Sequence, residues 1–295
     1  MRFRTNYSHS AYLFLAPAMT AIFVFFFLPV LAALVMSFTD FDIYSLGDMS
    51  RARFIGFSNY LNLFQNPLFW KALGNTAYFV VVGVPLSIMT SMLVALALNS
   101  KLTRFKSLFR FSYFLPVVTT LVAVAVIWRY IYHPRFGLAN YLLNLIGIKP
   151  VDWLGNPHWA MPALIIMAVW KGFGYNMIIF VAGLQNIPET LYEAARLDGA
   201  NGWQEFRNVT IPMLSQTTGF ITITTLIGYC QFFAEPYVMT DGGPLNSTLS
   251  IVLLMYKEGF KFWRMGYSAA IAFILFGIIL ILTIVQLRVQ KQYEI

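Results

Sequence analysis

The chain has 295 residues, of which 59% are hydrophobic and 11% are charged, and its mean hydropathy is +0.67. Soluble domains carry about 25% charged residues, so this composition excludes a water-soluble globular fold and indicates a protein of the lipid bilayer. The net charge of +8 does not indicate a nucleic-acid partner, because most basic residues lie at the ends of apolar runs, where they meet anionic lipid headgroups.

Six apolar stretches are long enough to cross the bilayer as helices, which takes about 20 residues each. They cover residues 11–38, 72–98, 111–131, 161–184, 213–234 and 268–287. The first is too long for the apolar region of a signal peptide and shows no cleavage site, so we expect it to be retained. All are too uniformly apolar for barrel strands. The sequence therefore predicts an all-α polytopic membrane protein, with a tail at residues 1–10 and one transmembrane domain at residues 11–295.

The basic residues indicate the orientation of the spans. Lysine and arginine divide evenly, ten and ten, between the two sides of a six-span arrangement. However, the N-terminal tail and the short loop 99–110 are basic without any acidic residue, and they flank the first spans, which usually dominate the topology. We therefore expect both termini, loop 99–110 and loop 185–212 in the cytoplasm.

A charged insert, NIPETLYEAARLDGANGWQEFRNVTIP, follows the fourth apolar stretch at residues 186–212. Pro188 and Glu189 suit the first turn of a helix. Gly199 is expected to end that helix, and a second short helix begins in the segment NGWQEF. The insert is thus predicted to be a helix, a glycine turn and a helix outside the hydrocarbon.

The first of these helices has features of a docking surface. Glu193 and Arg196 are spaced i, i+3 and are placed to form an ion pair. Ala194 and Ala195 are small, so another backbone can approach closely. Physical reasoning alone gives equal weight to a cap on the membrane bundle and to a module that binds a partner protein.

The insert resembles the EAA loop of ABC-importer permeases. The positions that match its pattern are Glu193, Ala194, Ala195, Asp198, Gly199, Ala200, Phe206 and Pro212. Gln216 departs from it, because many relatives have a second proline there. Further motifs resemble the carbohydrate branch of the family, the maltose and glycerol-phosphate type, over nearly the whole chain: LFLAP at 13–17, VAVAVIW at 122–128, WKGFGYNMIIFVAGLQNIPETLYEAA at 170–195 and TDGGPLNST at 240–248.

The resemblance implies a type I ABC importer permease fold in a bacterial inner membrane. Such a chain forms half of a carbohydrate pore with a second, homologous permease. Two cytoplasmic ATPase subunits bind ATP and magnesium, and an extracytoplasmic solute-binding protein delivers the sugar. By the same resemblance, Glu193, Ala194, Ala195, Asp198 and Gly199 form the coupling helix that contacts an ATPase. The chain itself has no GxxxxGK[ST] motif and no zinc or iron–sulfur spacing, so we expect it to hold no metal and no cofactor.

Polar residues within spans are candidates for substrate contact. They are Lys171, Tyr175 and Asn176 in the fourth span and Tyr229, Gln231 and Glu235 near the outer end of the fifth. Amides, carboxylates and aromatic rings suit the hydroxyl groups and C–H faces of sugars. In maltose-type permeases the sugar site lies in the corresponding parts of these helices, which favours Tyr175 and Gln231. Alternatively, Lys171 reaches an interface or pairs with Glu235, and Asn176 bonds a helix backbone.

Two other functions deserve comparison with the permease. A stand-alone secondary transporter or channel usually shows internal repeats, and the sequence has none. A membrane enzyme needs His, Asp, Glu or Cys clustered near one face, whereas the acids here are scattered over loops and Cys230 is the only cysteine. The substrate stays open among a neutral sugar, an oligosaccharide, a uronate and glycerol phosphate. Lys171 is the only candidate cation for an anionic substrate.

Overall fold

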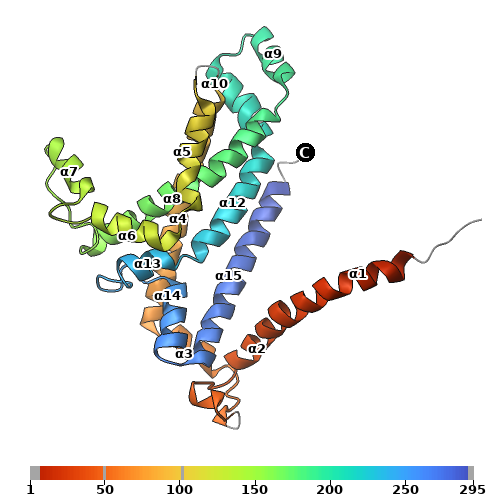
Figure 1. The fold of residues 1–295 in the computed structure, drawn as a ribbon, viewed down its shortest axis with the longest axis vertical. Helices are drawn as coiled ribbons and strands as arrows, with labels where there is room; N and C mark the ends of the chain where they lie inside the picture. The colour runs from red at the N-terminus through yellow and green to blue at the C-terminus, as the bar shows by residue number, and fades with distance from the viewer. Residues whose placement is uncertain (1–6, 49–50, 101–102, 292–295) are drawn as a thin grey trace, which may run out of the picture. The chain divides into compact units, whose positions relative to one another are not determined.

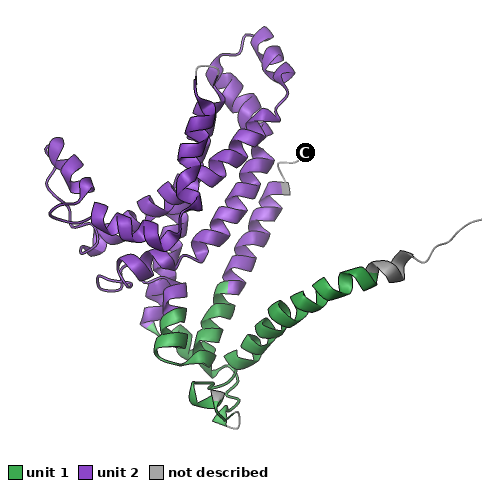
Figure 2. Ribbon diagram, viewed as in Figure 1, with its two compact units in different colours: residues 1–66, 255–275 green, residues 67–254, 276–295 purple. Residues whose placement is uncertain are grey.

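The computed structural model describes residues 7–48, 51–100 and 103–291, so part of the expected N-terminal tail and part of loop 99–110 lie outside the described residues. The chain divides into two compact units (Figure 2): residues 1–66 with 255–275, and residues 67–254 with 276–295. The described ranges contain helices and no β-strand (Figure 1). This confirms the all-α prediction.

In unit 1 the chain begins with α1 (Tyr7–Ile22), a π-helical turn (Phe23–Phe27) and α2 (Leu28–Ser37), which together contain an apolar run long enough to span a membrane. Pro29 lies in the first turn of α2, and the wide turn before it accommodates the missing N–H. Asn59, on α3 (Ser58–Gln65), donates hydrogen bonds to the carbonyl oxygens of Ser37 and Thr39, at 2.9 Å each. These bonds satisfy carbonyls at the end of α2 and fix its junction with α3.

Unit 1 also contains a short 3₁₀ turn (Tyr44–Leu46), the π-helical turn Lys257–Lys261, the last residues of α14 (Ile251–Tyr256) and the first part of α15 (Met265–Lys291). Unit 2 holds the remaining helices. They are α4 (Pro67–Asn99), α5 (Lys106–Val118), α6 (Leu121–Ile131), α7 (Leu138–Leu145), α8 (Pro157–Gln185), α9 (Glu189–Leu197), α10 (Gly202–Glu205), a π-helical turn (Phe206–Thr210), α11 (Ile211–Met213), α12 (Ser215–Cys230) and α13 (Ala234–Met239).

The packing of α4 against α8 forms the core of unit 2. Small residues recur every four positions on the buried face of α4, at Gly83, Ser87, Ser91 and Ala95. This spacing lets the helix backbones approach closely, as is common in membrane proteins. The Ser91 hydroxyl also donates to the Phe173 carbonyl oxygen of α8 at 3.0 Å. The seam therefore combines close packing with an interhelical hydrogen bond.

The expected third span, residues 111–131, differs from a single helix. It consists of α5 and α6, and the helix direction bends by 100° between them. Pro116 lacks the N–H for a helical hydrogen bond, and Thr119 and Thr120 are extended. The Thr119 hydroxyl bonds the Pro116 carbonyl oxygen at 2.6 Å, so the break is stabilised locally.

Four described helical runs are long and apolar enough to span a membrane: Tyr12–Ser37, Pro67–Asn99, Pro157–Gln185 and Met265–Gln290. The bent pair of α5 and α6 accounts for a fifth segment. Helix α12, in the expected fifth span, has 16 residues, fewer than the roughly 20 needed to cross hydrocarbon unaided. These helices are consistent with six membrane segments, two of which are not continuous full-length spans. Cys230 is buried, as its apolar setting predicts.

Candidate functional site

A pocket of about 290 Å³ lies in unit 2 beside α8 and α12, with walls from α4, the α5–α6 bend and α13. Its lining residues are Ser87, Val117, Leu121, Ala168, Lys171, Gly172, Tyr175, Asn176, Thr224, Thr225, Gly228, Tyr229 and Glu235. Ligand pockets usually measure about 300–1,000 Å³, so this volume is close to the lower limit of that range.

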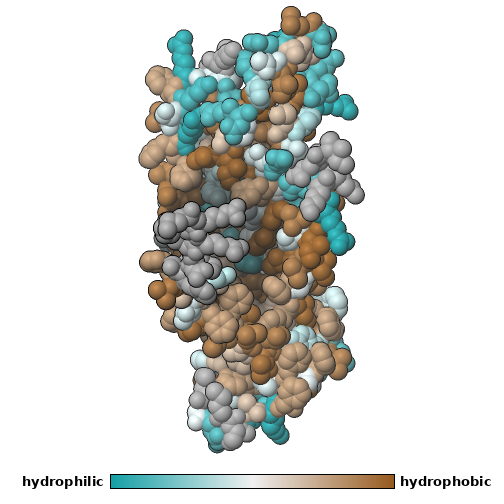
Figure 3. Space-filling view, turned by 90° about the vertical axis from the view of Figure 1, so that its right-hand side faces the viewer, coloured by the Kyte–Doolittle hydropathy of each residue, from teal (hydrophilic) through white to brown (hydrophobic). Residues whose placement is uncertain are grey.

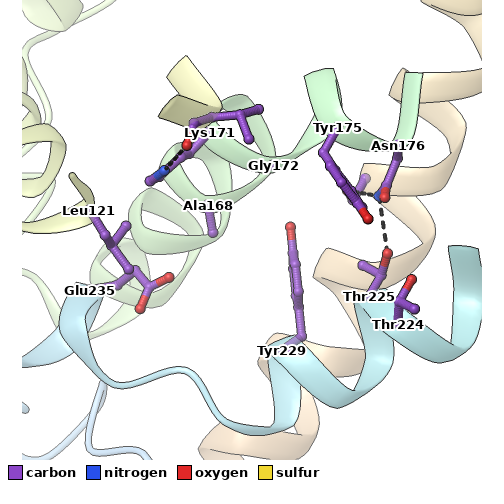
Figure 4. A pocket seen from close by; sticks show the side chains of 13 residues that line it. Leu121, Ala168, Lys171, Gly172, Tyr175, Asn176, Thr224, Thr225, Tyr229 and Glu235 are labelled. Carbon is purple, nitrogen blue, oxygen red and sulfur yellow. Dashed lines mark hydrogen bonds between the residues drawn. The ribbon is translucent and has the colours of Figure 1, made fainter. Parts of the chain in front are cut away.

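Two aromatic rings face the pocket from different helices. Tyr175 on α8 is 48% exposed. Tyr229 on α12 packs against Phe79, with ring centroids 5.1 Å apart, and its ring occupies the space beside Gly83. In Figure 4 both side chains extend into the same space. The pair thus brings two aromatic rings to the pocket, while the hydroxyl oxygen of Tyr229 is buried.

Asn176 joins three helices at the pocket wall. Its side-chain amide donates to the Thr225 hydroxyl at 3.0 Å and to the Ser87 hydroxyl at 3.4 Å (Figure 4). The residue is buried, and its hydrogen bonds go to side chains of α4 and α12. Asn176 therefore positions the lining helices. The sequence offered a helix backbone as an alternative partner, but the hydrogen bonds of Asn176 go to side chains.

Lys171 has a role that the sequence does not reveal. Its ammonium group donates to the carbonyl oxygens of Pro116, Val117 and Thr119, at 3.2, 3.4 and 3.1 Å. These carbonyls lie at the end of α5, where the bend removes their helical partners and the helix dipole favours a cation. The charge of Lys171 also interacts with that of Glu235, although the two side chains form no direct ion pair within the described part of the chain.

The remaining two predicted residues lie in different settings. Glu235, in the first turn of α13, is 8% exposed and lines the pocket. Its Oε2 atom has no hydrogen-bond partner among the described residues. Gln231 is exposed at the end of α12 and is not part of the lining. The sequence reasoning missed Thr224 and Thr225, although Thr225 precedes Tyr229 by one helical turn and shares its face.

The charged insert is a helix, a turn and a helix, as predicted. Gly199 has φ of +81°, in the left-handed region that favours glycine. Its N–H donates to the Arg196 carbonyl oxygen at 3.0 Å, and the Ala200 N–H donates to the Ala195 carbonyl oxygen at 2.9 Å. This is the Schellman arrangement that ends a helix. Asn201 and Gln204 then form a capping box at the start of α10.

The insert presents its family-motif residues to solvent. Glu193, Ala194, Asp198 and Gly199 are exposed, and Ala195 is half-buried. Two apolar side chains accompany them, Leu197 at 89% exposure and Trp203 at 66%. Figure 3 shows hydrophilic side chains gathered at the end of unit 2 that carries α9 and α10. These two side chains add exposed apolar area to an otherwise polar surface.

Ion pairs within the insert differ from the expected one. Arg196 bonds Glu205 of α10 at 3.0 Å and lies 3.8 Å from Glu189, so the expected pair with Glu193 is replaced. The hydrogen bond and charge of Glu205 hold the pKa of the Arg196 guanidinium above its usual value. Because α10 folds back beside α9, Glu205 reaches the guanidinium and leaves the Glu193 carboxylate facing outward.

The described residues contain no group of three or more His, Cys, Asp or Glu side chains able to hold a metal ion. The candidate site is a largely apolar pocket among membrane helices that carries a few polar side chains, together with an exposed, charged loop. A pocket among membrane helices and an exposed charged loop are features of a membrane transport subunit.

Residues 10–294 match the family described as the inner membrane component of binding-protein-dependent transport systems, and the chain belongs to this family. The lactose transport system permease protein LacF of Rhizobium radiobacter is 38% identical over 97% of this chain and 95% of that protein. The arabinooligosaccharides transport system permease protein AraP of Bacillus subtilis is 35% identical over 96% and 89%. The chain is thus a non-catalytic permease subunit of the inner membrane.

The fold agrees with that of a solved transporter. A bacterial ABC transporter involved in the import of the acidic polysaccharide alginate superposes with a TM-score of 0.80. The sequences are 22% identical, and the match covers 97% of this chain and 96% of that chain. This likeness shows the type I importer permease fold.

Proposed function

We propose that this chain forms half of the translocation pore of an ATP-driven carbohydrate importer. The observation that carries the proposal is the family match over residues 10–294 in a chain that has both an intramembrane pocket with polar side chains in its lining and an exposed EAA loop. Its partners are a second permease, two cytoplasmic ATPases and an extracytoplasmic solute-binding protein. The names of LacF and AraP, a lactose and an oligosaccharide permease, support a saccharide substrate.

The exposed loop is the coupling element in this proposal. Glu193, Ala194, Ala195, Asp198 and Gly199 contact an ATPase, with the Glu193 carboxylate facing a basic side chain of that partner. Closure of the ATPases on ATP then moves the loop, and the attached helices α8 and α12 transmit the motion to the pocket. The Schellman turn supports this role, because it gives the loop a defined shape without a rigid core.

The pocket is the place where the saccharide passes. The rings of Tyr175 and Tyr229 contact C–H faces of the sugar, and Glu235 contacts hydroxyl groups. Asn176 holds the lining helices in register. Lys171 acts on the bend rather than on the sugar, and Gln231 lies near the mouth. In this arrangement the chain crosses the membrane six times, with both termini and loop 185–212 in the cytoplasm.

A charge reversal in the loop tests the coupling. We expect Glu193→Lys to abolish co-purification of the ATPase subunits and saccharide uptake by the reconstituted importer, while the thermal unfolding of the permease is unchanged. Asp48→Lys is the matched control, because this exposed carboxylate lies outside the insert and the substitution also replaces a negative charge by a positive one. Full ATPase binding and uptake by Glu193→Lys refutes the assignment of the loop.

The alternative, a stand-alone secondary transporter or channel, predicts a different result. In that case liposomes that contain only this chain take up the solute without ATP. We expect no uptake from the chain alone and ATP-dependent uptake from the complete assembly. Robust uptake by the isolated chain overturns the proposed function.

A further inference from the structure

A second pocket in unit 2, of about 240 Å³, lies along one face of α6 and the turn that follows it. We call it the α6 pocket, and its lining consists of Val126, Arg129, Tyr130 and His133. These positions are spaced i, i+3, i+4 and i+7, so they share one helix face. None of them lines the pocket beside α8 and α12, so the α6 pocket is a separate feature of unit 2.

The α6 pocket combines a fixed positive charge with further hydrogen-bond donors. In the described part of the chain the exposed Arg129 guanidinium makes one hydrogen bond, from Nη1 to the Val238 carbonyl oxygen at 3.4 Å, and its other N–H groups stay available. Nδ1 of His133 accepts a hydrogen bond from the Arg135 N–H at 3.2 Å, so Nε2 is the donor nitrogen of this ring. The Tyr130 hydroxyl is a third donor, on a side chain that is 66% exposed. A planar guanidinium beside two further donors suits the oxygens of a phosphate.

Toward the α5–α6 bend, the same face of α6 becomes apolar. Val122 and Val126 lie there, at 55% and 41% exposure. A helix rises about 17 Å from Val122 to His133, and one leaflet contributes about 15 Å of hydrocarbon to the bilayer. The face therefore changes from apolar to cationic over the length of one leaflet, which is the order of groups in a phospholipid.

The neighbouring helix α7 exposes a second apolar face. Leu138, Leu142 and Leu145 share this face, at 54%, 54% and 66% exposure. Asn140, on the opposite face, is buried and donates to the Val151 carbonyl oxygen at 2.8 Å, which fixes the orientation of the helix. Figure 1 shows α6 and α7 together at one side of unit 2. Exposed apolar area beside donors for an anion is typical of a surface that contacts lipid.

The charges of this part of the chain have one sign. Residues 121–151 contain Arg129, Arg135 and Lys149 and no aspartate or glutamate. A basic surface at the end of a membrane segment attracts anionic headgroups. The charge and the apolar stripe are thus complementary to the two ends of the same molecule.

We propose that the α6 pocket binds one anionic phospholipid. Arg129, Tyr130 and His133 donate to its phosphate, and its acyl chains lie along Val122 and Val126. A soluble phosphate compound accounts for the donors but not for the apolar part of the face, which is why a lipid is the occupant. Helix α6 begins at Leu121, which lines the pocket beside α8 and α12, so the bound lipid holds one wall of that pocket.

The test is a lipid titration of the assembled importer, purified in detergent, in which native mass spectrometry counts the bound molecules. The probes are dioleoyl phosphatidylglycerol, which is anionic, and dioleoyl phosphatidylcholine, which has no net charge. We expect phosphatidylglycerol to bind more tightly than phosphatidylcholine. We expect Arg129→Gln to raise the apparent Kd of phosphatidylglycerol about tenfold or more, because charge-assisted hydrogen bonds to the phosphate are lost. Equal binding of the two lipids to the wild type overturns the proposal.

Arg135→Gln is the matched control, because it removes the same charge from an exposed side chain of the same segment that does not line the α6 pocket. We expect this variant to change the apparent Kd less than twofold. An equal loss in Arg129→Gln and Arg135→Gln means that the surface attracts lipid only through its general charge, and it overturns the site.

Two further measurements distinguish the lipid from other occupants. Glycerol 1-phosphate carries the phosphate without acyl chains, and we expect millimolar concentrations of it not to displace phosphatidylglycerol. Displacement at the Kd of the lipid itself assigns the pocket to a soluble phosphate compound and refutes the proposal. Binding of phosphatidylglycerol to the isolated chain but not to the assembled importer shows that a protein subunit covers this face, and it refutes the proposal as well.

Discussion

Substitutions at Gly199 separate backbone conformation from side-chain bulk. A Cβ at this position meets no atom within 4 Å, so a steric clash within the chain does not limit substitution. The backbone conformation limits it, because at a φ of +81° an L-residue in the left-handed region costs about 1–2 kcal/mol. We expect Gly199→Ala to cost the turn about this amount, Gly199→Val more, and Gly199→Asn less than about 1 kcal/mol.

This free energy corresponds to a measurable change in population. A cost of 1–2 kcal/mol lowers the ratio of folded to opened turn roughly 5- to 30-fold. The amides of Gly199 and Ala200 report it directly, since they donate to Arg196 and Ala195 and exchange only when the turn opens. Their hydrogen-exchange protection is expected to fall in the order Gly, Asn, Ala, Val.

The same series tests coupling in the assembled importer. ATP-dependent saccharide uptake is expected to follow the amide protection, while the global melting temperature stays constant because α9 and α10 lie outside the buried core. Equal protection and uptake for Val and Asn refutes the reasoning. That outcome means that the turn does not need the left-handed conformation for function.

Two predictions concern stability, each measured as thermal unfolding of the detergent-solubilised chain. Gly174→Ala is expected to lower the free energy of unfolding by about 1–3 kcal/mol, because the added Cβ would meet the Tyr113 carbonyl oxygen. Gly172→Ala is the control, because a Cβ there meets no atom, and equal melting temperatures of the two variants contradict the close approach of α5 and α8. Asn140→Ala is expected to lower the free energy of unfolding by about 2–4 kcal/mol, because the Asn140 side chain bonds the Trp153 indole and three backbone groups at 2.8–3.1 Å. An unchanged melting temperature of this variant contradicts that role.

The sequence predicts the long helices well because each of them is marked by residues within its own segment. An uninterrupted apolar run marks α4 and α8, and prolines at residues 67 and 157 extend both by starting the first turn. The turn at Gly199 is equally local, since glycine and the following asparagine are the residues it needs. The bend between α5 and α6 is not visible in this way, because the apolar pattern continues across Thr119 and Thr120.

The pocket is predictable only in part. Tyr175, Asn176 and Tyr229 stand out as polar residues within spans, and the structure brings them together. The role of Lys171 depends on carbonyl oxygens released by a bend 52–55 residues away in sequence, which no composition or spacing signals. Gln231 has the expected chemistry but lies one residue past the end of α12, where its side chain is exposed.

The bend between α5 and α6 has a consequence for the lipid around the pocket. Helix α5 has 13 residues and is therefore about 20 Å long, some 10 Å short of the usual hydrocarbon thickness. Hydrophobic mismatch of this size is relieved by local thinning of the bilayer or by water. Val117 and Leu121, on either side of the bend, line the pocket, so we expect such thinning beside its wall. In a bilayer thinned there, a solute at this wall has a shorter apolar barrier to cross than the full membrane presents.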